Sequence, residues 1–193
     1  MTAITVTPPI GRRAALAALS AHLLVALIAL VGIGGATRVM EAGLACPDWP
    51  LCYGSLLPGR QMNLQVFLEW FHRLDAFVVG IGLLVQAALS TWWRRELPRA
   101  VSWLSGSALL LVAVQGGLGA LTVTLLLPFS VVTAHLVTAL LLVALLSACT
   151  QVLLEPSTSA RAPQASRFSL NWLWPWLIGL VALLALGQCL LGG

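Results

Sequence analysis

The stretch LQVFLEWFHRLDAFVVGIGLLVQAALSTW, residues 64–92, decides the fold of this chain. It is longer than the roughly 20 mostly apolar residues that a helix needs to cross a bilayer. Its first half carries four ionisable side chains: Glu69, His72, Arg73 and Asp75. Ionisable groups at membrane depth are costly and usually mark a function. The stretch therefore predicts a transmembrane helix that carries chemistry.

The rest of the chain has the composition of a membrane protein. Of its 193 residues, 60% are hydrophobic and 8% are charged, whereas soluble domains carry about a quarter charged residues. Four further stretches have spanning length: residues 14–37, 101–126, 129–153 and 172–191. We therefore expect an all-α membrane protein, with a four-helix transmembrane bundle over residues 14–154 and a fifth transmembrane helix over residues 171–193. The composition excludes a disordered chain and a secreted disulfide scaffold.

The arginines predict the orientation of the helices. All ten basic residues are Arg, and short cytoplasmic segments retain positive charge. Seven lie in the tail at residues 1–13, between the second and third predicted helices, and in the linker at residues 155–170; two lie in the loop at residues 38–63. We expect the tail and the linker in the cytoplasm, and the loop and the C-terminus outside. This pattern favours the lipid bilayer as the partner and indicates no nucleic acid.

Two histidines on different predicted helices lie at similar depth. Counted at 1.5 Å per residue from the outer helix starts, His72 is about 12 Å deep and His135 about 9 Å deep. A haem iron needs two such imidazoles as axial ligands, one on each side of the ring. The alternative is a pair of buried histidines satisfied by backbone carbonyls or by Glu69. Zinc is disfavoured because Cys149 and Cys189 lie nearer the wrong ends of their helices.

Two charged side chains accompany His72 on its helix. Glu69 shares a face with His72, because residues three apart are neighbours on a helix. Arg73 lies near the same depth, where it either contacts a haem propionate, pairs with a carboxylate or extends to the membrane surface. The sequence therefore places a carboxylate and a guanidinium beside one of the two candidate ligands.

The predicted outer loop holds a pair of cysteines. Cys46 and Cys52 are separated by five residues that include two prolines. An oxidising compartment permits a disulfide there, and a structural staple and a redox-active pair both remain open. A redox pair would suit a membrane oxidoreductase that generates disulfides and passes electrons to quinone. Such proteins typically relay through a second reactive pair, and the sequence offers no second outer pair.

Five motifs together resemble one known family. They occur in order within the first 150 residues: GGATR (34–38), GLACPDWPLC (43–52), EWFHR (69–73), QGGLGALTV (115–123) and AHL (134–136). This combination resembles the haem A synthase family of cytochrome oxidase assembly. The cysteine loop followed by Glu-x-x-His-Arg is the most specific part of the resemblance.

The resemblance implies an activity and roles for the candidate residues. Family members oxidise the C8 methyl of haem O to the formyl group of haem A through successive hydroxylations. His72 and His135 would be the axial ligands of the haem, Arg73 would belong to the haem-binding site, and Glu69 would match the glutamate required for the oxidation. Cys46 and Cys52 would match the outer-loop pair that forms a disulfide. The expected setting is a prokaryotic cell membrane, with haem O, haem O synthase and cytochrome oxidase subunits as partners.

The chain departs from the family's usual form in one respect. That form has eight helices in two similar halves, each with a histidine pair, whereas this chain resembles a short single-half form without the pair that would hold haem B. We expect a homo-oligomer to restore two halves. The alternative function is a non-catalytic membrane carrier or assembly factor that holds haem O or haem B. A carrier would use the same histidines and would not need Glu69.

Overall fold

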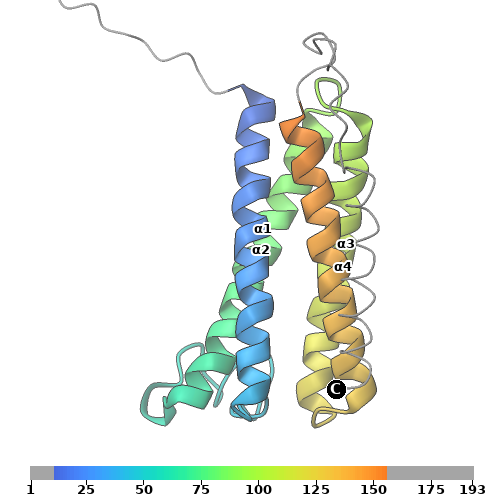
Figure 1. Ribbon diagram of the computed structural model, residues 1–193. Coiled ribbons are helices and arrows are strands. Elements are labelled where there is room, and N and C mark those ends of the chain that lie inside the picture. Colours follow the sequence, from blue (N-terminus) through green and yellow to red (C-terminus); the bar gives the residue numbers. More distant parts are fainter. Residues whose placement is uncertain (1–10, 156–193) are drawn as a thin grey trace, which may run out of the picture.

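The computed structural model describes residues 11–155 of the chain, and its regular structure there is helical (Figure 1). Four long helices follow one another, with a short 3-10 helix before the second: α1 (Arg12–Val39), η1 (Gly59–Gln61), α2 (Leu64–Trp92), α3 (Arg99–Thr124) and α4 (Phe129–Leu154). The predicted all-α fold is confirmed. The second helix has the predicted bounds, and the others differ by one or two residues at their ends. The predicted fifth helix and most of the linker before it lie outside the described residues.

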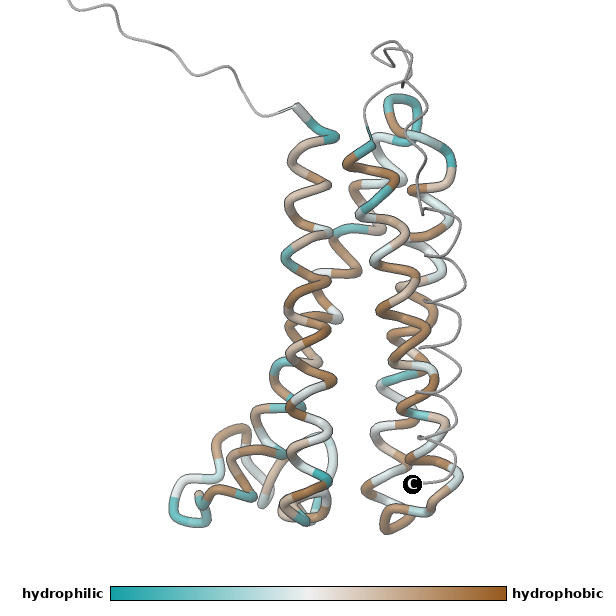
Figure 2. The backbone as a smooth tube through the Cα atoms, in the orientation of Figure 1, coloured by the Kyte–Doolittle hydropathy of each residue, from teal (hydrophilic) through white to brown (hydrophobic). Residues whose placement is uncertain are grey.

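The four helices form an antiparallel bundle. α1 packs against α2 and α4, and α3 packs against the same two helices. α2 and α4 are therefore diagonal partners that face each other across the bundle. All four helices are long and apolar enough to cross a membrane, and Figure 2 shows hydrophobic residues along most of their length. The protein is an integral membrane protein.

The bundle has two chemically different ends. We call the end formed by residues 12–13 and 93–99 the arginine end, which is uppermost in Figure 1, and the end formed by residues 40–63 and 125–128 the disulfide end. At the arginine end, Arg13 donates hydrogen bonds to the carbonyls of Val152 (2.8 Å) and Leu153 (2.9 Å). These contacts satisfy the last turn of α4, whose carbonyls lack partners within the helix. At the disulfide end, Asn63 caps α2 by accepting a 2.9 Å hydrogen bond from the Val66 N–H.

The bundle core is closely packed through its middle and towards the arginine end. Two clusters of buried side chains fill this region, and their fully buried members include Leu16, Leu83, Val101 and Leu146. The polar groups among them mostly pair across helices; the hydroxyls of Ser20 and Thr150, for example, lie 2.8 Å apart. Packing in this half fixes how the four helices lie against one another, and it thereby fixes their relative positions in the opposite half.

Candidate functional site

His72 and His135 both lie in the half of the bundle next to the disulfide end. His72 is in the third turn of α2, and His135 is in the second turn of α4. Both side chains are half-buried. Since α2 and α4 are diagonal partners, the two helices that carry these histidines face each other across the bundle.

The surroundings of the two rings leave a buried polar atom of each without a partner within the described part of the chain. Nδ1 of His72 and Nδ1 of His135 are buried and have no hydrogen-bond partner among the described residues, although buried polar atoms are nearly always satisfied. Each ring also faces a glycine of the preceding helix. A Cβ added to Gly34 would lie 3.0 Å from Cε1 of His72, and one added to Gly119 would lie 3.7 Å from Cε1 of His135. One buried nitrogen of each ring, Nδ1, is therefore uncommitted among the described residues, and each ring has a glycine as a neighbour.

Glu69 lies one turn before His72 on α2 and is 4% exposed. Its Oε2 accepts a 2.8 Å hydrogen bond from the main-chain N–H of Cys46 in the outer loop. Its Oε1 forms an ion pair with Arg73, one turn further along α2. Both carboxylate oxygens are therefore held, one by the loop and one by the helix.

Arg73 fastens the outer loop to the same turn of α2. Its Nη1 donates to the carbonyls of Asp48 and Leu51, each at 2.6 Å, and its Nη2 donates to the carbonyl of Cys46 at 3.2 Å. Together with the ion pair to Glu69, these contacts form what we call the loop clamp: Glu69, Arg73 and the main chain of residues 46–51. The clamp ties the loop to α2 at the level of His72.

The loop itself is closed by a disulfide between Cys46 and Cys52. Both cysteines are almost fully buried, at 0% and 1% exposed, and pack against Val66 of α2. Within the ring, the carboxylate of Asp48 accepts hydrogen bonds from the main-chain N–H groups of Tyr53 (2.6 Å) and Gly54 (2.8 Å). The disulfide loop is thus an ordered cap seated on the helix that carries Glu69 and His72.

Comparison with known proteins identifies the family. A family profile described as cytochrome oxidase assembly protein (COX15-CtaA) matches residues 17–66 and 60–193. A protein of Shewanella oneidensis named "Heme A synthase" is 37% identical over 188 residues, which cover 88% of this chain and 53% of the relative. The chain belongs to the haem A synthase family of cytochrome oxidase assembly.

Further members of the haem A synthase family match at similar levels. The "Heme A synthase" of Mesorhizobium japonicum is 30% identical over 200 residues, covering 89% of this chain and 53% of the relative. That of Sphingopyxis alaskensis is 30% identical over 151 residues, covering 61% of this chain and 42% of the relative. The chain thus spans about half the length of the curated relatives that it matches. No solved structure matches the chain.

In this haem A synthase family member, Arg73 has several partners among the described residues. The sequence left open a haem propionate, a carboxylate or the membrane surface as its partner. Arg73 pairs with the carboxylate of Glu69 and with three carbonyls of the outer loop. Its side chain is 15% exposed, so it does not extend to the surface. The structure thus brings together Glu69, His72, Arg73 and the disulfide, with His135 across the bundle.

Sequence reasoning missed residues that support His135 and its helix. Gln115 of α3 donates hydrogen bonds from its Nε2 to the carbonyl of His135 (3.0 Å) and to Oγ1 of Thr138 (2.7 Å). Thr133 carries a further buried oxygen without a hydrogen-bond partner among the described residues. Gln115 opens the motif QGGLGALTV, so its membrane depth was a usable signal, because an amide at that depth needs a partner. The identity of the partner required the packing of α3 on α4.

Proposed function

We propose that this protein oxidises the C8 methyl of haem O to a formyl group and so takes part in making haem A for cytochrome oxidase. The observation that carries this proposal is that His72 and His135, on diagonal helices, each have a buried Nδ1 with no hydrogen-bond partner among the described residues. The names of the relatives and the match to cytochrome oxidase assembly proteins support the same chemistry. Haem O is the substrate in this proposal, and its methyl group is oxidised in the net change CH3 + O2 → CHO + H2O, in which dioxygen is the oxidant and the source of the oxygen atom.

His72 and His135 bind the iron of the substrate from opposite faces. Ligation by both imidazoles would fix the plane of the ring between α2 and α4, and contacts at the edge of the ring would set which substituent faces Glu69. The glycines facing the two imidazoles, Gly34 and Gly119, leave room for the rings to turn towards the iron.

Glu69 acts on the methyl edge of the substrate. Its carboxylate accepts or returns a proton at the C8 substituent, and the loop clamp fixes its position through Cys46 and Arg73. Arg73 is a positioning residue in this scheme, because its donors are directed to Glu69 and the loop. The disulfide preserves the loop conformation that presents the Cys46 N–H to Glu69.

The same proposal includes a setting and partners. The disulfide end faces the outside of a prokaryotic cell membrane, as the arginine distribution predicts. The working unit in this proposal is a homo-oligomer of the chain. Haem O synthase and the oxidase subunits are its partners before and after the reaction.

Extraction of the pigment bound to the purified protein tests the function. The protein is produced in cells that make haem O, and the extracted haem is separated by chromatography and identified by mass. Haem A or its hydroxylated precursor is the expected pigment. Haem O or haem B alone, from cells in which the protein also fails to raise haem A content, would favour a carrier and overturn the proposal.

A further inference from the structure

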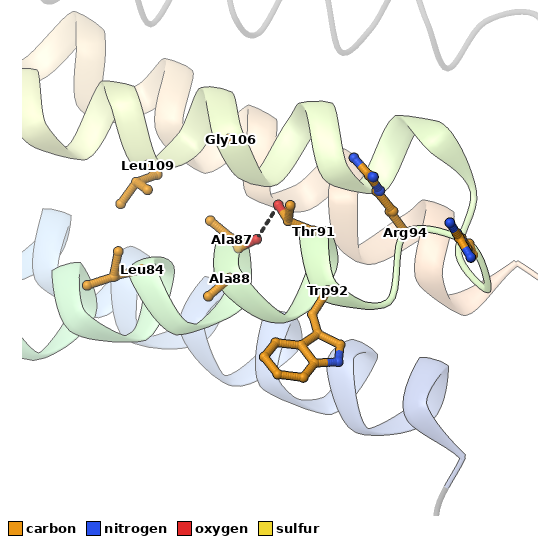
Figure 3. Close-up of a pocket in the computed structure, with 9 residues that line it drawn as sticks. Leu84, Ala87, Ala88, Thr91, Trp92, Arg94, Gly106 and Leu109 are labelled. Carbon is orange, nitrogen blue, oxygen red and sulfur yellow. Dashed lines mark hydrogen bonds between the residues drawn. The ribbon is translucent and has the colours of Figure 1, made fainter.

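A groove lined in part by two arginines lies at the arginine end of the bundle, at the opposite end from His72 and His135. It runs between α2 and α3 and measures about 900 Å³. Its residues are shown in Figure 3: Leu84, Ala87, Ala88, Thr91, Trp92, Arg94, Arg95, Gly106 and Leu109. A volume of this size is in the range of sites that hold small molecules, roughly 300–1,000 Å³.

The floor of the groove is apolar because most of its residues are aliphatic, and it is open because several of them are small. Ala87, Ala88 and Gly106 lie where α2 and α3 approach each other, and Leu84 and Leu109 lie at the far end from the arginines (Figure 3). A Cβ added to Gly106 would meet nothing within 4 Å. The single hydroxyl of the floor, that of Thr91, is already bonded to the carbonyl of Ala87 at 2.8 Å. The floor therefore has no free polar group and suits a hydrocarbon chain.

The mouth of the groove carries two positive charges that no described residue neutralises. Within the described part of the chain, Arg94 and Arg95 form neither an ion pair nor a side-chain hydrogen bond, and no lining residue is acidic. The nearest carboxylate in sequence, that of Glu96, is paired with Arg12. Trp92 is 84% exposed beside them, at the level where aromatic side chains meet lipid headgroups.

We propose that this groove is a binding site for an anionic phospholipid, with the phosphate between Arg94 and Arg95 and one acyl chain along the floor. Charge complementarity and position favour this occupant. Guanidinium groups match phosphate oxygens well, and basic pockets between transmembrane helices bind anionic headgroups. The apolar floor lies next to the hydrocarbon of the bilayer, so lipid acyl chains are available to fill it. The site does not depend on the proposed oxidation.

Native mass spectrometry of the full-length protein in detergent tests the proposal. The probes are phosphatidylglycerol and phosphatidylcholine with identical acyl chains. We expect phosphatidylglycerol to bind about 30-fold more tightly, from two arginines near the headgroup. The double variant Arg94→Gln/Arg95→Gln should lose this preference. Arg99→Gln, which removes a charge at the same end but does not line the groove, should keep it.

A second variant tests the acyl chain independently of charge. Gly106→Leu places a side chain in open space within the groove and should weaken the binding of phosphatidylglycerol with both arginines present. Equal retention of the two lipids by the unaltered protein would overturn the proposal. So would displacement of the lipid by millimolar inorganic phosphate together with no effect of Gly106→Leu, because that result indicates a phosphate site. A dimer that Gly106→Leu abolishes, with lipid retention unchanged, would assign the groove to a second copy of the chain.

Discussion

The two halves of the bundle differ in how they treat buried polar groups. In the half towards the arginine end, hydroxyls such as Ser20 and Thr150 pair across helices, within a core that includes Leu83 and Leu146. In the half next to the disulfide end, His72, Thr133 and His135 each have a buried atom without a hydrogen-bond partner among the described residues. The arginine-end half has one such atom, Oε1 of Gln86. Since unsatisfied buried groups cost stability, the difference separates a packing half from a binding half.

The loop clamp explains why the binding half keeps its shape with fewer packed side chains. The buried residues of α4 all lie in its second half: Leu142, Leu146, Cys149, Thr150 and Leu153. At the other end, order comes from the disulfide loop and its hydrogen bonds to Glu69 and Arg73. Hydrogen bonds and ion pairs depend strongly on distance and direction. They therefore hold Glu69, Arg73 and the loop in one geometry, as a site for chemistry requires.

Removing either axial histidine should have the broadest effect, because both haem binding and haem A formation depend on it. We expect His72→Ala and His135→Ala each to lower the haem content of the purified protein at least tenfold, because one imidazole is lost from a two-ligand site. The pyridine haemochrome assay measures this content. His22→Ala is the matched control, because the His22 ring bonds to the Ala18 carbonyl of its own helix. Full haem content in either ligand variant would contradict the assignment of the binding half.

Glu69→Gln should separate binding from chemistry. The amide can still accept the hydrogen bond from the Cys46 N–H, but it cannot exchange a proton at the substrate. We expect normal haem content and a fall in haem A formation of about 100-fold or more. Chromatography of extracted haem gives both values. Glu96→Gln, at the arginine end, should form haem A normally, and a normal yield from Glu69→Gln would remove Glu69 from the mechanism.

Leu146→Ala should affect the packing half alone. Leu146 is fully buried in the bundle core, and truncation of such a leucine costs about 2 kcal/mol or more. We expect a lower thermal unfolding temperature in detergent, with haem bound in the same ratio to folded protein. Circular dichroism and haem absorption, recorded together, measure the two quantities. If Leu146→Ala instead lost haem at an unchanged unfolding temperature, the two halves would not have the separate roles assigned to them.

Arg73→Lys should loosen the loop clamp. A lysine keeps the charge but cannot donate to Glu69 and to three loop carbonyls at once. We expect main-chain amides of residues 46–54 to exchange hydrogen about tenfold faster, which corresponds to the loss of one charge-assisted hydrogen bond. Hydrogen exchange with mass spectrometry detects this change. Unchanged exchange together with loss of haem would instead assign Arg73 to the haem.

The two glycines that face the histidines should respond unequally, with the smallest effect of the series. In Gly34→Ala the new Cβ would lie 3.0 Å from the His72 ring, so the ring must move by a few tenths of an ångström, whereas Gly119→Ala makes an ordinary 3.7 Å contact with His135. We expect a shifted haem absorption band in the first variant and an unshifted band in the second. Reduced-minus-oxidised difference spectra resolve the two cases. The opposite order would show that the rings lie differently in the haem-bound protein.

Most of the fold could be predicted from the sequence because apolar runs of membrane length have few alternatives. The second helix was predicted over its full length, and the structure shows that Asn63 caps its start. The first helix begins two residues earlier than predicted, at Arg12. The reason is tertiary: Arg13 is held by the last carbonyls of α4, a contact that hydropathy does not contain.

The candidate site was only partly predictable. Counting residues along two helices was enough to place His72 and His135 at a common depth. The partner of Arg73 was not predictable, because it depends on how residues 46–51 fold back onto α2. The support of His135 by Gln115 likewise depends on the packing of α3 on α4. The spacing of residues within one helix could be predicted from the sequence, whereas contacts between a loop and a helix could not.

The central claim is that one haem is held between α2 and α4 by two imidazoles. Electron paramagnetic resonance of the purified, oxidised protein tests it most directly. The account predicts a low-spin ferric signal typical of two histidine ligands, which either His72→Ala or His135→Ala converts to a high-spin signal or abolishes. A low-spin signal that survives both substitutions would contradict the account.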